Sequence, residues 1–167
     1  MKKIVATNVL FVFLLFIFNG IQAQTQQPKP DQLKLMQQFI GTWQGEIGKD
    51  SAMVIEMQQY GKSIIETDYL VVKGKKEVDS KWSYGYSPET GKFKFFAVYP
   101  NGSCQTWLGS FTSEKKWEQQ MVQDFNPEKV LMKSELNFIT PDSFTGFQMK
   151  PTGEKIGKEF KATRIKK

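Results

Sequence analysis

Two acidic residues, Glu66 and Asp68, stand two positions apart in a segment that alternates like a β-strand. Two carboxyl groups on one strand face could work as the acid–base pair of a hydrolase. The intervening and following residues, Thr67, Tyr69 and Val71, form the more apolar phase of this segment. We therefore expect Tyr69 to point inward and the two acids to face water, which makes catalysis by this pair the less favoured interpretation.

The composition limits other catalytic and metal chemistry, because the chain has no histidine and one cysteine. The lack of histidine excludes Ser-His-Asp and Cys-His catalysis, haem held by a proximal histidine, and zinc sites of the usual histidine-containing kinds. Cys104 alone can form neither an intrachain disulfide nor a thiolate zinc cage, and we expect it to be a small buried hydrophobe. The sequence thus predicts no catalytic residue, no metal and no cofactor.

Aromatic and methionine side chains recur on one phase of several strand-like segments. Aromatic rings offer large flat contact areas, phenol groups can orient a polar group, and methionine adapts to irregular ligands. The alternative is that these side chains simply fill the core. If they line a cavity, a one-residue register shift would put Lys81 and Gln120 inside instead. The expected wall consists of Tyr69, Trp82, Tyr84, Tyr86, Phe95, Met121 and Met132.

The elements that must position these residues are short and strand-like. After Gly41 the chain alternates with period two, and turn residues interrupt it at regular intervals, which is typical of an all-β protein. The short connections predict antiparallel neighbours in an up-and-down β-barrel of about ten strands, although a two-sheet sandwich fits the same pattern. Before Gly41, Asp31 is expected to cap a short helix that covers one end of the sheet. The expected strands are residues 42–47, 52–59, 63–72, 78–86, 92–99, 103–111, 117–125, 130–139, 144–149 and 160–165.

One arginine, Arg164, stands among 23 basic residues that are otherwise lysine. A guanidinium can stack on an indole face while donating hydrogen bonds in a fixed fork, which an ammonium cannot do. The first expected strand opens Gly41-Thr42-Trp43, and Arg164 lies on the last. If the two strands are neighbours, Arg164 can pack on Trp43.

A Gly-x-Trp at the start of the first strand, with an arginine on the last, resembles the calycin superfamily of lipocalin-like β-barrels. In that family the arginine packs across the tryptophan where the barrel closes, which favours a barrel over a sandwich and gives Gly41, Trp43 and Arg164 a role in closure. Residues 86–88, 92–99 and 107–111 also resemble the central strands of small bacterial lipocalin-like domains of unknown function. Related nitrobindin-type barrels hold haem through a histidine, so haem binding does not carry over to this chain.

The first 23 residues have the pattern of a secretory signal peptide. Lys2 and Lys3 precede an apolar run over 9–18, and Ile21-Gln22-Ala23 offers a cleavage site. The run is short for a membrane helix, which needs roughly 20 residues, so an uncleaved anchor is the lesser alternative. We expect a signal peptide at 1–23, a flexible leader at 24–30 and a lipocalin-like domain at 31–167, exported to the periplasm or the outside and without stable membrane insertion after cleavage.

The net charge of +6 arises from lysines spread along the chain. Nucleic-acid-binding proteins usually show a denser basic stripe that contains arginine, so no nucleic-acid partner is expected. The preferred hypothesis is a non-enzymatic binding protein for a small apolar or amphipathic ligand held in the lumen. One alternative is an enzyme with a carboxylate and a tyrosine at the barrel mouth, acting on a small hydrophobic substrate. The other is a structural envelope module with a filled core.

Overall fold

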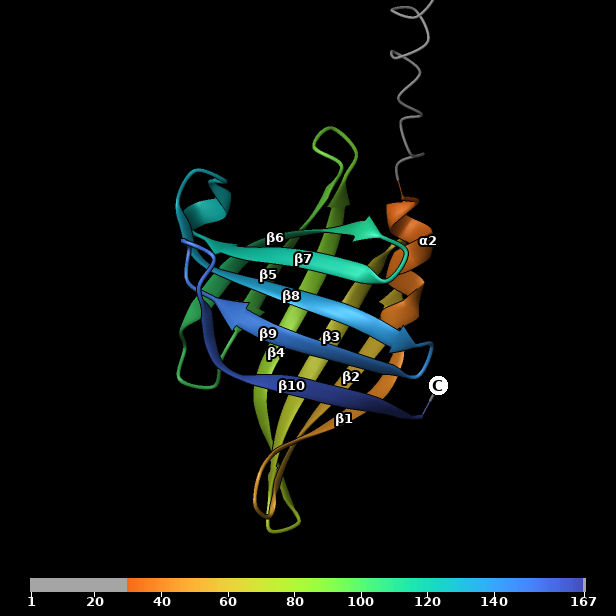
Figure 1. Ribbon diagram of the computed structural model, residues 1–167, viewed down its shortest axis with the longest axis vertical. Helices are drawn as coiled ribbons and strands as arrows, with labels where there is room; N and C mark the ends of the chain where they lie inside the picture. Colours follow the sequence, from red (N-terminus) through yellow and green to blue (C-terminus); the bar gives the residue numbers. More distant parts are fainter. Residues whose placement is uncertain (1–29, 167) are drawn as a thin grey trace, which may run out of the picture.

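The structure is a computed structural model that describes residues 30–166, which form a closed barrel of ten antiparallel strands (Figure 1). The predicted signal peptide and nearly all of the predicted leader lie outside the described residues. A short α-helix and a 3-10 helix precede the barrel, and a second 3-10 helix interrupts it. The elements are α2 (Gln32–Met36), η1 (Gln37–Phe39), β1 (Gly41–Gly48), β2 (Ser51–Tyr60), β3 (Ser63–Val72), β4 (Lys75–Ser87), β5 (Lys92–Val98), β6 (Cys104–Ser113), β7 (Lys116–Val122), η2 (Gln123–Phe125), β8 (Val130–Thr140), β9 (Ser143–Met149) and β10 (Lys155–Lys166).

Every strand pairs with its neighbours along the chain, and β1 also pairs with β10. The predicted fold class, an up-and-down antiparallel β-barrel with a short N-terminal helix, is therefore confirmed, and the sandwich alternative is wrong. Closure pairs Trp43 with Arg164 and Gln44 with Thr163 across the seam. It leaves neither β1 nor β10 with an unpaired edge, which open sheets must protect by other means.

The predicted strands match the observed ones to within two residues at most ends, and the largest differences are at the start of β4, the end of β7 and the start of β10. The strand expected at 117–125 ends at Val122, because Gln123–Phe125 form a 3-10 turn in which Asp124 and Phe125 have φ angles of 52° and 57°. The final strand begins at Lys155 instead of residue 160, and its pairing with β9 shifts register between Ile156 and Phe160. This irregularity interrupts the alternation of inward- and outward-facing side chains, so the sequence pattern does not identify residues 155–159 as part of the strand.

The helix α2 begins where the sequence predicts, because the Asp31 carboxylate accepts a hydrogen bond of 3.1 Å from the backbone N–H of Lys34. The Gln32 side chain then docks the helix on β6, donating to the carbonyl of Phe111 at 2.9 Å and accepting from its N–H at 2.8 Å. The helix lies against one end of the barrel (Figure 1). None of the helices in residues 30–166 has the length and apolarity needed to cross a membrane.

The helical segment closes its end of the barrel with two buried side chains. Met36 and Phe39 are 2% and 4% exposed. The Phe39 ring lies 5.8 Å from the Trp117 ring and 4.9 Å from that of Phe138, measured between ring centroids. Because β1 leads away from this end, the connections that follow odd-numbered strands surround the opposite end of the barrel.

Candidate functional site

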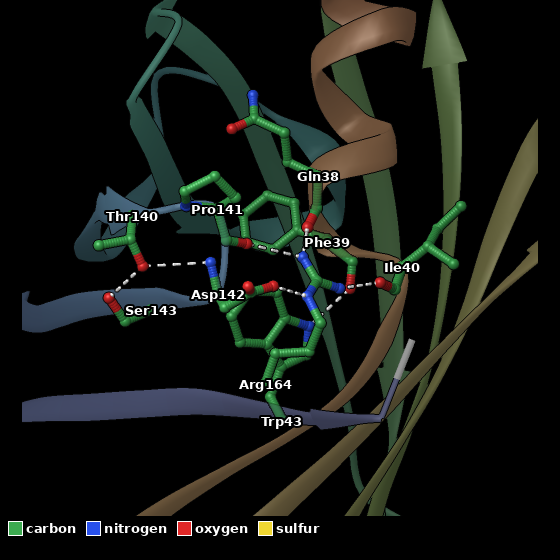
Figure 2. Close-up of polar contacts among 9 residues, drawn as sticks. All are labelled: Gln38, Phe39, Ile40, Trp43, Thr140, Pro141, Asp142, Ser143 and Arg164. Atoms are coloured by element: carbon green, nitrogen blue, oxygen red, sulfur yellow. Dashed lines mark hydrogen bonds and ion pairs between the residues drawn. The ribbon is translucent and has the colours of Figure 1, made fainter.

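The seam between β1 and β10 is held by Arg164. Its guanidinium carbon lies 4.0 Å from the centre of the Trp43 ring, so the expected contact is present. The guanidinium donates to the Gln38 carbonyl at 2.7 Å and to the Ile40 carbonyl, both at the end of the helical segment (Figure 2). It also donates to Asp142 at 2.9 Å in the β8–β9 turn. One side chain thus joins the last strand, the first strand, the helical segment and a turn.

Gly41 and Trp43, the other two residues of the seam, explain why the first strand begins with Gly-x-Trp. Gly41 has a φ of 126°, a conformation that L side chains rarely adopt, where the chain leaves η1 and enters β1. Trp43 is fully buried, and its indole N–H donates to the Phe39 carbonyl at 2.7 Å. The seam is therefore structural, since its polar groups are occupied by one another.

The barrel encloses a cavity of about 590 Å³. It extends from Phe39 under the helical segment toward Ile47 and Lys158, near the opposite end. Aromatic, methionine and aliphatic side chains make most of its wall, and polar side chains cluster on part of it. The polar members include Glu66, Asp68, Tyr84, Tyr99, Gln105, Gln119 and Ser134.

Of the seven residues predicted to form the wall, Trp82, Tyr84 and Met132 line the cavity. Phe95 is 1% exposed and stacks on Tyr84 with 4.6 Å between centroids, so it belongs to the core outside the cavity lining. Tyr86, which packs on Phe93, and Met121 lie against the hydrophobic core without lining the cavity.

Tyr69, the last of the seven predicted wall residues, was expected to point into the barrel, and this prediction is wrong. Its hydroxyl donates to Glu56 at 3.3 Å, and the Lys76 ammonium lies 3.6 Å from the centre of its ring. These partners lie on the outer phase of β2 and β4. The Tyr69 side chain therefore packs on the outside of the barrel.

The same phase error applies to the two acids, which were expected to face water. Glu66 and Asp68 are 7% and 8% exposed and line the cavity. They share their phase with Ile64, which is 3% exposed, and they pair across β2 with Met57 and Ile55, which also line the cavity. The sequence shows which face of β2 is apolar, but it does not show how β3 pairs with β2. The more apolar face of β3, taken by itself, therefore predicts the wrong face to be inside the barrel.

Donors from β4 make the burial of these carboxyl groups tolerable. The Tyr84 hydroxyl donates to Glu66 Oε2 at 2.6 Å. Ser80 Oγ and the Trp82 indole N–H both donate to Asp68 Oδ2, at 2.9 Å and 2.8 Å. Asp68 Oδ1 is buried and receives no hydrogen bond from these groups.

Burial dominates the electrostatics of this cluster. It raises the pKa of Glu66 well above 4.5, and the neighbouring Asp68 charge raises it further. Burial also raises the pKa of Asp68, although hydrogen bonds from Glu66, Ser80 and Trp82 oppose the rise. The pKa of Tyr84 is well above its ordinary value of 10 because of burial and the Glu66 charge. The cluster therefore favours a state in which Glu66 keeps a proton and Asp68 carries the negative charge.

Two glutamines on the wall were missed at the sequence level. Gln105 Oε1 accepts from the Tyr99 hydroxyl at 2.9 Å and from the Trp107 indole at 3.1 Å. Gln119 Oε1 accepts from the Trp117 indole at 2.7 Å. In each case the glutamine stands two residues from the tryptophan that donates to it, so the shared strand phase was the available signal.

The remaining candidates for chemistry do not join the cavity. Cys104 is exposed at the start of β6, so the expectation of a buried thiol is wrong. Ser80, the one hydroxyl hydrogen-bonded to Asp68, is 1% exposed and does not line the cavity. Among residues 30–166, no three His, Cys, Asp or Glu side chains come together in a way that could hold a metal ion.

Neither a protein-family model nor a curated protein matches this sequence.

Proposed function

We propose that this chain is an exported, lipocalin-like binding protein that holds a small amphipathic molecule in the barrel lumen. The observation that carries the proposal is the cavity of about 590 Å³. Small-molecule sites typically enclose roughly 300–1,000 Å³ and combine mostly apolar walls with a few converging polar groups. A structural module whose core is filled by its own side chains would not need this space.

The family and export parts of the proposal rest on the sequence. The Gly41, Trp43 and Arg164 seam supports membership of the calycin superfamily, because that closure is the feature by which the chain resembles it. The charged start and the apolar run at 9–18 support export to the periplasm or the outside.

The wall chemistry supports an amphipathic occupant. Met53, Met57, Met132 and Leu136 offer adaptable apolar surface, while Glu66 and Asp68 form a polar cluster on β3. An apolar body would gain roughly 25 cal/mol for each Å² that it buries, before the costs of ordering are subtracted. A polar end would gain most beside the two carboxyl groups, because they lie in a desolvated site.

Native mass spectrometry of protein purified from its own host tests the proposal directly. A small molecule that travels with the barrel and dissociates on unfolding is the expected result. In parallel, an uncharged environment-sensitive fluorophore should bind the empty protein and be displaced by octanol. If no molecule co-purifies with the protein and the fluorophore does not bind at any concentration tested, lumen binding would be refuted.

An enzyme remains the second candidate, because Glu66 is an inward-facing carboxyl group with a raised pKa beside Tyr84. Binding is preferred because Glu66 and Asp68 project from one strand, whereas the paired carboxyl groups of a glycosidase flank the bond to be broken. The ligand itself distinguishes the two: recovery of an added ligand unchanged after long incubation supports binding, and its conversion supports catalysis.

A further inference from the structure

The lumen wall contains a buried carboxylate, that of Asp68, to which the described protein offers the proton of Glu66 but no further donor beyond Ser80 and Trp82. All four indole N–H groups are paired, those of Trp43 with a carbonyl, Trp82 with Asp68 and Ser80, Trp107 with Gln105, and Trp117 with Gln119. Among the buried side-chain nitrogen and oxygen atoms of residues 30–166, Asp68 Oδ1 alone receives no hydrogen bond from an indole, hydroxyl, amide or backbone group, which leaves the proton of Glu66 as its donor in the empty barrel. Asp68 is 8% exposed and lines the cavity, so its carboxyl group is part of the wall that a bound molecule contacts.

The carboxyl groups also lack a cation. Every ion pair described for residues 30–166 involves other acids, and neither Glu66 nor Asp68 takes part in one. Lys158 is the single basic residue of the cavity wall, and it is exposed on β10. Asp79 on β4 adds a further negative charge near that of Asp68. A buried carboxylate without a counter-ion is costly, so a cation entering the lumen would be stabilised there.

Aromatic rings lie beside the acids. Trp82, which is hydrogen-bonded to Asp68, lies 5.9 Å from Trp107 between ring centroids, and both line the cavity with Tyr99. The face of an indole attracts a cation within about 6 Å of its centre, most strongly where water is excluded. A hydrogen-bond acceptor, a negative charge and aromatic faces thus converge on one part of the wall.

We propose that the ligand of this barrel is an amphiphile with a primary or secondary ammonium group, which donates a hydrogen bond to Asp68 Oδ1. This inference rests on the proposed function, because it names the chemical class of the molecule held in the lumen. A quaternary ammonium would keep the charge and lose the hydrogen bond, whereas an alcohol would keep a donor and lose the charge.

The proton on Glu66 takes part in this binding. Burial and the Asp68 charge raise the pKa of Glu66, so in the empty barrel we expect Glu66 to keep a proton, which relieves its repulsion with Asp68. When an ammonium binds beside Asp68, the proton of Glu66 is released to solvent. Glu66 and Asp68 together then carry one more negative charge, which the positive charge of the ammonium balances. The other groups that titrate near the pair are Asp79 and Tyr84 on β4 and Tyr99 after β5, while β2 presents the uncharged Ile55 and Met57.

The experiment is a calorimetric titration of the full-length protein, after removal of its native occupant, with octylamine, octyltrimethylammonium, octanol and octanoate at one ionic strength. Octylamine should bind roughly tenfold more tightly than octanol, because both donate a hydrogen bond to Asp68 but only the ammonium also carries the opposite charge. Octyltrimethylammonium should fall between them, and octanoate should bind most weakly although the chain carries a net charge of +6. Octylamine binding should also release a proton, seen as different apparent enthalpies in phosphate and Tris buffers.

The outcomes separate this inference from the proposed function. Equal affinities for octanol and octylamine would overturn the ammonium class while leaving lumen binding intact, and failure of all four probes would overturn both. Tight octylamine binding with identical enthalpies in the two buffers would overturn the exchange of the ammonium for the Glu66 proton. The ligand series uses the parent protein, so it does not depend on whether any variant folds.

Variants then locate the site. In Asp68→Asn, the amide oxygen can still accept from Ser80 and Trp82, which turns the amide NH₂ toward the position of the unpaired oxygen. This variant should lose the preference for octylamine over octanol, with octanol binding little changed. Glu46→Gln removes one negative charge from an exposed position on β1 and serves as the matched control. Retention of the octylamine preference in a folded Asp68→Asn would overturn the assignment of Asp68.

Discussion

Arg164 lies over Trp43, with 4.0 Å from the guanidinium carbon to the ring centre, and this contact joins the last strand of the barrel to the first. The guanidinium also donates to the carbonyls of Gln38, Ile40 and Pro141. These carbonyls belong to the segments that precede β1 and β9. The seam therefore depends on a planar group that satisfies several acceptors at once.

Replacing Arg164 by lysine should lower the free energy of unfolding by about 2 kcal/mol, because an ammonium cannot stack on the indole and reach all of these acceptors. Urea denaturation followed by tryptophan fluorescence measures the change. The control is Lys161→Ala on the same strand, where the side chain is exposed and no such loss is expected. Equal stability of Arg164→Lys and the parent would show that charge alone is sufficient at the seam.

A second prediction concerns the side chain that closes the helical end of the barrel. Phe39 is 4% exposed and packs on several buried rings, so Phe39→Ala should destabilise the protein by about 3–5 kcal/mol. Leu33 on the same segment is 40% exposed, and Leu33→Ala should cost far less. Similar losses from the two substitutions would mean that the helical segment is not part of the cooperative core.

A third prediction tests a close approach between two strands. A Cβ added to Gly109 would lie 2.4 Å from Cζ2 of Trp117, which is itself 1% exposed and unable to move freely. Gly109→Ala should therefore cost about 1–3 kcal/mol through overpacking. A Cβ at Gly85 meets nothing nearer than 4.0 Å, so Gly85→Ala is the matched control and should be close to neutral. Thermal unfolding of both variants measures the difference.

A fourth prediction follows from the raised pKa of Glu66, which burial and the Asp68 charge produce. The folded state holds this proton more tightly than the unfolded state. Its contribution to stability is thus complete below the unfolded pKa near 4.5 and is lost as the pH rises through the folded pKa. Glu66→Gln cannot titrate, so its stability relative to the parent should increase between about pH 5 and about pH 8.

Urea denaturation at the two pH values measures this relative stability. The control is Glu56, whose pKa is lowered by its hydrogen bond from Lys76. Glu56 is ionised in both the folded and the unfolded state across this range, so the difference between Glu56→Gln and the parent should stay constant. A constant difference for Glu66→Gln as well would argue against a proton held in the folded barrel.

The number of strands follows from local signals in the sequence, whereas closure was favoured by the resemblance that Gly41, Trp43 and Arg164 carry. Alternation and turn residues fit both a barrel and a sandwich, and the pairing of Trp43 with Arg164 separates the two, because it requires the first and last strands to be neighbours. The phase of β3 was not available in the same way, because both of its faces carry polar and apolar residues. Which face turns inward is decided by pairing with Met57 and Ile55 on β2 and with Trp82 and Ser80 on β4.

This limit explains why the acids were misplaced while Trp82 and Tyr84 were placed correctly. Near the end of β4 the residues of the inner face are all aromatic, so the composition of this strand alone predicts which of its faces turns inward. On β3 the inner phase is acidic, and its burial is possible only because Tyr84, Trp82 and Ser80 supply donors from the next strand. The hydrophobic pattern of one strand contains no information about hydrogen-bond donors on the adjacent strand.

A fifth prediction compares an aromatic side chain that lines the cavity with one on the outside of the barrel. An uncharged environment-sensitive fluorophore should bind the parent, and Trp82→Ala should weaken its binding at least several-fold, because Trp82 lines the cavity. Tyr69→Ala removes an aromatic ring of similar size from the outer phase of the neighbouring strand, where the ring packs against Lys76. That variant should bind the fluorophore as the parent does. Fluorescence titration of the three proteins, each first shown to be folded by circular dichroism, gives the dissociation constants. If Tyr69→Ala weakens binding and Trp82→Ala does not, the fluorophore occupies the outer surface of β3 and the lumen is not the binding site.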